Sequence, residues 1–84
     1  MTRYTVTWQR EAEGELVELW IAAADRDAIA AAVQAVDLAL SSDAELKGDA
    51  VAEGLRSFNA PPLRVLFVAR QADRVAEIVM VRRV

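Results

Sequence analysis

Residues 63–83 read LRVLFVARQADRVAEIVMVRR and predict a β-hairpin. Residues 63–70 and 74–83 are rich in β-branched side chains, as strands are. Residues 71–73 lie between them and are few enough for a tight loop. A shorter strand is expected at residues 55–59, just before Pro61 and Pro62. These three strands predict an antiparallel sheet in the C-terminal half of the chain.

The hairpin carries apolar side chains on both faces, Val65 and Phe67 on one and Leu66 and Val68 on the other. One face must cover the helices, and the other face of an antiparallel sheet is normally polar. Its apolar character indicates that something covers it. Residues 41–54, a second copy of the chain in a homodimer, and a partner chain are the three alternatives.

The N-terminal half predicts one strand and two helices. Tyr4, Val6 and Trp8 alternate with polar residues, which is the pattern of a half-buried strand. Two apolar stripes with helical spacing follow, and Asp25 is a plausible N-cap for the second helix. The side chains expected to be buried between helices and sheet are Leu16, Leu19, Trp20, Ile29, Val33 and Val36. The prediction is a single α+β domain over residues 1–84, in the order β-α-α-β-β-β, with a helical hairpin packed on an antiparallel sheet.

The composition excludes several kinds of chemistry. The chain has no Cys and no His, which rules out disulfides, thiolate metal sites and a histidine general base. No Gly-rich phosphate loop or nucleophile motif is present. We therefore expect no metal and no cofactor. No signal peptide is visible and no apolar run reaches the ~20 residues of a membrane span, so a cytoplasmic location without membrane contact is expected.

The charge is divided unevenly along the chain. Residues 1–53 hold four basic and eleven acidic side chains, whereas residues 54–84 hold six arginines and two acids. Such asymmetry indicates either a charged partner or attraction between the two halves of the fold. The sequence leaves both interpretations open.

Arginines gather where the C-terminal strands are expected to meet. Arg64 lies inside an apolar strand, and antiparallel pairing brings Arg82 and Arg83 next to it. Arg56 joins them if its strand is adjacent. An arginine fork binds phosphate bidentately and keeps its charge, so Arg56, Arg64, Arg82 and Arg83 are candidate phosphate- or target-binding residues. A slip of one residue in register would exchange Arg82 for Arg83 on this face.

The ordered set of segments resembles the bacterial RelE/ParE superfamily of plasmid-stabilisation-type toxins. Residues 4–20 (YTVTWQREAEGELVELW) are similar to the family's opening strand and acidic helix. Residues 54–56 (GLR), 62–67 (PLRVLF) and 78–83 (IVMVRR) are similar to its later strands. The resemblance implies the toxin of a type II toxin–antitoxin pair, neutralised by a cognate antitoxin. RelE-like members cleave mRNA on the ribosome, and ParE-like members inhibit DNA gyrase. It also implies that Arg64 matches the strand arginine of the nucleases.

The sequence departs from the nuclease pattern in its acid–base residues. Lys47 is the only lysine, no His is present, and Tyr4, the only tyrosine, falls on the first strand. These departures favour a ParE-like or catalytically degenerate toxin. If the chain is an enzyme, the resemblance implies a ribosome-dependent endoribonuclease, with Tyr4 the first acid–base candidate. The alternative function is a non-toxic protein-binding module on the same fold.

Overall fold

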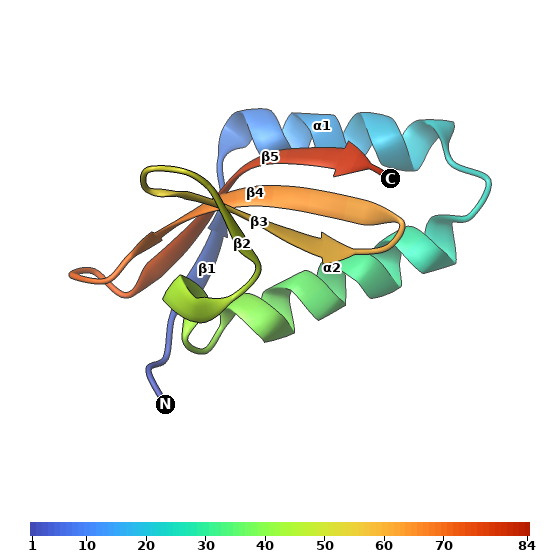
Figure 1. Cartoon of the computed structure of the whole chain (residues 1–84). Coiled ribbons are helices and arrows are strands. Elements are labelled where there is room, and N and C mark those ends of the chain that lie inside the picture. Colours follow the sequence, from blue (N-terminus) through green and yellow to red (C-terminus); the bar gives the residue numbers. More distant parts are fainter.

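Five strands form one sheet that is covered on one face by two helices (Figure 1). The computed structural model describes residues 1–84. The elements follow the order β1 (Thr5–Trp8), α1 (Arg10–Ala22), α2 (Arg26–Leu40), the 3-10 turn η1 (Ala44–Leu46), β2 (Asp49–Ala52), β3 (Leu55–Ala60), β4 (Leu63–Arg70) and β5 (Val75–Arg83). The strand order across the sheet is β1-β5-β4-β3-β2. The α+β class and the C-terminal hairpin are confirmed.

The sheet differs from the prediction in two respects. It is mixed, because β1 pairs with β5 in parallel, from Thr5 opposite Val75 to Trp8 opposite Ile78. A parallel neighbour needs a long crossover, and here the crossover contains every other element of the chain. The second difference is β2, an edge strand that pairs with β3 across a bulge. All four of its residues are exposed, so it has no buried face to give a strand pattern in the sequence.

The core lies between the sheet and the helices. α1 packs along β5, whereas α2 packs along β3 and β4. β4 and β5 contribute the fully buried Leu63, Val65, Phe67 and Ile78, and α2 contributes Ile29, Val36 and Leu40. Burial alternates along the strands because successive side chains point to opposite faces.

Trp20 is the exception to the predicted core. Ile29 and Val36 are fully buried, and Leu16, Leu19 and Val33 are half-buried against the core. Trp20 is 39% exposed, so its predicted burial is wrong. α1 and α2 lie over different strands and leave the seam between them open. The line of α1 that faces the core runs through Ala12, Leu16 and Leu19, and Trp20 lies on its flank.

The second face of the sheet is partly covered by the chain itself. Leu66 and Met80 are half-buried there, and Val51 of β2 lies with them in one hollow. Residues 41–54 thus supply part of the cover that the apolar face requires.

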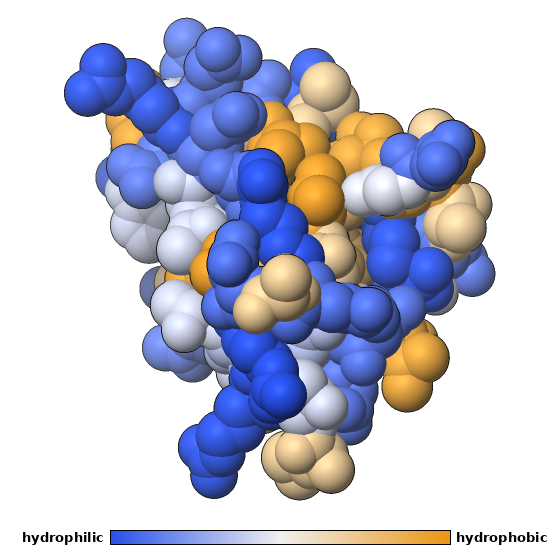
Figure 2. All heavy atoms as spheres, turned by 90° about the vertical axis from the view of Figure 1, so that its left-hand side faces the viewer, coloured by the Kyte–Doolittle hydropathy of each residue, from blue (hydrophilic) through white to orange (hydrophobic).

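Figure 2 shows hydrophilic side chains over much of one end of the molecule, with apolar side chains gathered in its upper part. No helix has the length and hydropathy to cross a membrane.

Candidate functional site

Two arginines leave neighbouring strands on the sheet face opposite the helices, and the guanidinium group of one of them, Arg82, reaches Glu15 of α1. In the β4–β5 register, Arg64 lies directly across from Arg82. Their neighbours Leu63, Val65 and Val81 are buried, so Arg64 and Arg82 leave their strands on the side turned away from the core. They border a hollow of about 290 Å³ whose apolar wall is formed by Val51, Leu66, Met80 and Val84.

Arg64 is the unpaired member. It is exposed and makes no hydrogen bond or ion pair. Glu77, the only acidic residue of β5, lies opposite Val68 and accepts a hydrogen bond from Arg70 at 2.7 Å. Like charges directly opposite each other on a sheet destabilise it. An anion between the two guanidinium groups would remove that repulsion, and their planar forks suit a phosphate or carboxylate.

Arg82 is held by α1. Its Nη1 donates to Glu15 Oε2 at 2.6 Å and to the carbonyl of Val81 at 2.9 Å. The other oxygen of Glu15 accepts the backbone N–H of Val81 at 3.1 Å. This N–H lies beyond the end of β1, on the edge of β5 that there has no neighbouring strand. The hydrogen bond from Arg82, followed by that from Val81, lowers the pKa of Glu15.

Arg83 and Arg56 have other partners. Arg83 Nη2 donates to Asp25 Oδ2 at 2.6 Å, which joins the end of β5 to the link between the helices and lowers the pKa of Asp25. Arg56 donates to the carbonyls of Lys47 at 2.7 Å and Gly48 at 3.0 Å. The expected cluster of Arg56, Arg64 and Arg82 is therefore wrong for Arg56.

Arg56 lies apart from Arg64 and Arg82 because side chains alternate between the two faces of the sheet along β3. Arg56 lies opposite Phe67, a buried core residue, whereas Asn59 lies opposite Arg64. Arg56 thus shares the helix-side face with Phe67, and the turn before β2 takes up its donors. Register also separates the C-terminal arginines. Arg82 shares the face of Arg64, whereas Arg83 lies opposite Leu63, although its side chain also lines the hollow that Arg64 and Arg82 border.

Tyr4 is not placed for acid–base chemistry. It is 6% exposed and belongs to the core. Neither its hydroxyl nor Glu45 Oε2 has a hydrogen bond of good geometry. The Glu45 carboxylate beside it, together with burial, raises the pKa of Tyr4 to about 12. A phenol in that state stays protonated near neutral pH, and its side chain is removed from the face that carries Arg64.

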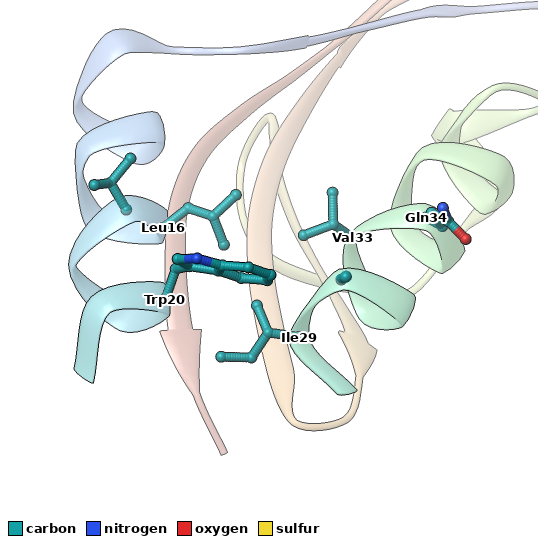
Figure 3. Close-up of a pocket in the computed structure, with 7 residues that line it drawn as sticks. Leu16, Trp20, Ile29, Val33 and Gln34 are labelled. Atoms are coloured by element: carbon teal, nitrogen blue, oxygen red, sulfur yellow. The ribbon is translucent and has the colours of Figure 1, made fainter. Parts of the chain in front are cut away.

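The second feature is an apolar groove between α1 and α2 (Figure 3). It has a volume of about 410 Å³ and is lined by Leu16, Val17, Trp20, Ile29, Ala30, Val33 and Gln34. Figure 3 shows the Trp20 ring extending from α1 toward Ile29 and Val33 of α2. Val17 is 55% exposed on the same helix. The sequence did not predict this groove, because the apolar stripe of α1 has the spacing of a fully buried helix face. The signal was present in Val17 and Ile21, two apolar residues outside the predicted stripe.

Arg26 fixes the end of the groove. Its Nε donates to the carbonyl of Trp20 at 2.9 Å and its Nη2 to that of Ile21 at 3.2 Å. These bonds satisfy carbonyls in the last turn of α1, which have no partners within the helix. The guanidinium carbon also lies 5.7 Å from the centroid of the Trp20 ring, within the range of a cation–π contact. The exposed indole is thus held in a defined position.

Three acidic residues lie about one helical turn from residues that line the groove. Glu13 precedes Val17 by four residues, Asp27 precedes Ala30 by three, and Asp37 follows Val33 by four. Side chains at these spacings are neighbours along one face of a helix. The groove can therefore receive an apolar helix face whose borders carry basic residues.

Two solved structures are similar to this domain over its full length. A chain of the RelBE2 toxin–antitoxin complex from Mycobacterium tuberculosis has a TM-score of 0.82 and 22% identity, covering 100% of this chain and 94% of that one. A chain of the chromosomal ParDE toxin–antitoxin system from P. aeruginosa has a TM-score of 0.70 and 18% identity, covering 100% and 99%. No protein-family model and no curated protein matches the sequence. The chain has the RelE/ParE-type toxin fold.

Proposed function

We propose that this chain is the toxin of a type II toxin–antitoxin pair, held inactive by a cognate antitoxin that occupies the groove between α1 and α2. The observation that carries the proposal is the open apolar groove with the exposed Trp20. It occurs on a fold shared with chains of two toxin–antitoxin complexes. A small domain gains stability by mass action when a partner covers such a surface.

The groove suits one amphipathic helix of the antitoxin. Two roughly parallel walls of apolar side chains accept residues spaced i, i+3, i+4 and i+7 on a third helix. Glu13, Asp27 and Asp37 favour lysines or arginines at the borders of that helix. The fixed position of Trp20 adds affinity, because little side-chain freedom remains to be lost on binding.

The Arg64–Arg82 face is proposed to contact the target, either DNA gyrase or the ribosome with its mRNA. Two forks above an apolar wall bind an anionic group by electrostatics and need no proton transfer. RNA cleavage would also require an acid–base group. The chain has no His, and Tyr4 is buried with a raised pKa. Inhibition of the ParE-like kind, or a catalytically degenerate site, is therefore favoured over mRNA cleavage.

Induction of the chain in bacteria without its antitoxin tests the proposal. Growth arrest that is relieved by an antitoxin encoded beside the gene is expected. Normal growth with stable binding to that neighbour would instead indicate a non-toxic binding module. A concentration-dependent dimer that disappears on Trp20→Ala would show that a second copy occupies the groove.

In vitro assays separate the two targets. Gyrase supercoiling assays are expected to show inhibition, and mRNA on programmed ribosomes is expected to remain intact. Site-specific cleavage in the ribosomal A site would overturn the assignment. The Tyr4→Phe variant would then show whether the buried phenol takes part, since loss of cleavage with unchanged folding would assign it a role.

A further inference from the structure

Glu15 of α1 contacts both the edge of β5 and one of the two arginines of the anion-binding face. One of its carboxylate oxygens accepts the backbone N–H of Val81, and the other accepts Nη1 of Arg82. The first bond satisfies a donor on the free edge of β5. It also fixes the carboxylate beside the arginine pair, so that Glu15 stays close even when the Arg82 side chain turns away.

We propose that Glu15 is an intrachain competitor that occupies Arg82 and lowers the affinity of the Arg64–Arg82 pair for its anionic target. The inference rests on the proposed function, because it concerns the same anion-binding face. Of the two arginines, Arg64 is free and Arg82 is neutralised by the chain's own carboxylate. A target phosphate or carboxylate must therefore compete with Glu15 for Nη1 of Arg82 and for its positive charge.

The ion pair between Arg82 and Glu15 can compete with an anionic target for Arg82, and it is weak enough for the target to displace it. The side chains of Arg82 and Glu15 are 56% and 32% exposed. Exposed ion pairs contribute little free energy and are screened by salt. A dianion that meets both guanidinium groups gains two charge-assisted contacts where Glu15 makes one. Nη1 of Arg82 also donates to the Val81 carbonyl, so the guanidinium group keeps one contact with its own strand when Glu15 is displaced.

Glu15→Gln isolates the competition from the fold. The amide oxygen of glutamine can still accept the Val81 N–H, whereas the negative charge that holds Arg82 is lost. Glu18→Gln is the matched control, since Glu18 lies on the same helix, is exposed and makes no hydrogen bond or ion pair. Both variants change the net charge equally.

The probe is inorganic pyrophosphate, titrated into the full chain at low salt and followed by the NMR signals of the arginine Nε–H groups. Glu15→Gln should bind about two- to fivefold more tightly than the wild type, the range expected when one exposed ion pair is removed. Glu18→Gln should bind as the wild type does. Arg64→Ala should weaken binding in both the wild-type and the Glu15→Gln background.

Each other outcome has a definite meaning. Equal tightening in both glutamine variants would mean that net charge alone acts, and the competition would be refuted. Weaker binding in Glu15→Gln would mean that Glu15 presents Arg82 instead of occupying it. If the wild type binds pyrophosphate and Glu15→Gln binds it with the same affinity, only the role of Glu15 would be overturned. Absence of binding in every variant would overturn the anion-binding face and the competition together, while the growth assay still tests the toxin assignment separately.

Discussion

Arg64 and Arg82 lie directly opposite each other on β4 and β5, and both point away from the hydrophobic core. Facing arginines weaken the hairpin that carries them. The neighbouring positions show how this chain neutralises other arginines, since Arg70 is paired with Glu77 and Arg83 with Asp25. Arg64 alone among these strand arginines has no such partner, which is the arrangement expected of a residue kept free for a ligand.

Arg64→Ala should abolish target binding or growth arrest and leave folding intact. The side chain is exposed and unpaired, so its loss should change the free energy of unfolding by no more than about 0.5 kcal/mol. A thermal melt and the growth assay on the same variant measure the two effects. Arg70→Ala is the control, because it removes an exposed arginine from the same strand. A clear loss of stability in Arg64→Ala with toxicity retained would give Arg64 a structural role.

Trp20→Ala should affect binding of the antitoxin more than folding. A fully buried tryptophan would cost about 3–5 kcal/mol on truncation, but Trp20 is 39% exposed and about 2 kcal/mol is expected. Its loss should weaken the complex by more than tenfold, as anchoring aromatics do. Urea denaturation and calorimetric titration measure the two quantities. Leu38→Ala, at a 77% exposed position of α2, should change neither.

The stability of the fold should fall in acid through Glu15 and Asp25. Contacts with Arg82 and Arg83 lower the pKa values of these carboxyls in the folded state. Their contribution is therefore complete above the ordinary carboxyl pKa of about 4 and is lost as the pH falls through the lowered values. Denaturation curves measured from about pH 6 down to about pH 2 should show this decline. The double variant Glu15→Gln, Asp25→Asn should show a shallower decline, and an unchanged slope would contradict the assignment.

Two glycines should respond to alanine in opposite ways. Gly14 lies in α1 with nothing near its added Cβ, so Gly14→Ala should stabilise the fold by about 1 kcal/mol and raise the Tm by about 4–8 °C. Gly48 has φ +64, and its Cβ would lie 1.8 Å from the carbonyl oxygen of Ser57. Gly48→Ala should cost about 2 kcal/mol or more. Thermal melts of the two variants measure these changes. An unchanged Tm in Gly48→Ala would contradict the backbone path of the turn that precedes β2 and accepts the hydrogen bonds of Arg56.

Local pattern in the sequence was sufficient for both helices, for every strand except β2 and for most of their buried faces. The β4–β5 hairpin follows from two β-branched runs around a short loop, and the buried face of α2 follows from Ile29 and Val36 at helical spacing. The order of the segments also predicted the toxin-like fold. These features depend on neighbours within a few residues, where the periods of helix and strand are legible.

Tertiary structure decided what depends on residues far apart in the chain. The parallel pairing of β1 with β5, the open seam that exposes Trp20, and the contact of Glu15 with Arg82 all join segments more than twenty residues apart or set the distance between whole elements. Arg56 shows the same limit, since its face depended on which residue of β4 it met. A register or a helix separation is chosen by the packing of the complete core, so no local pattern encodes it.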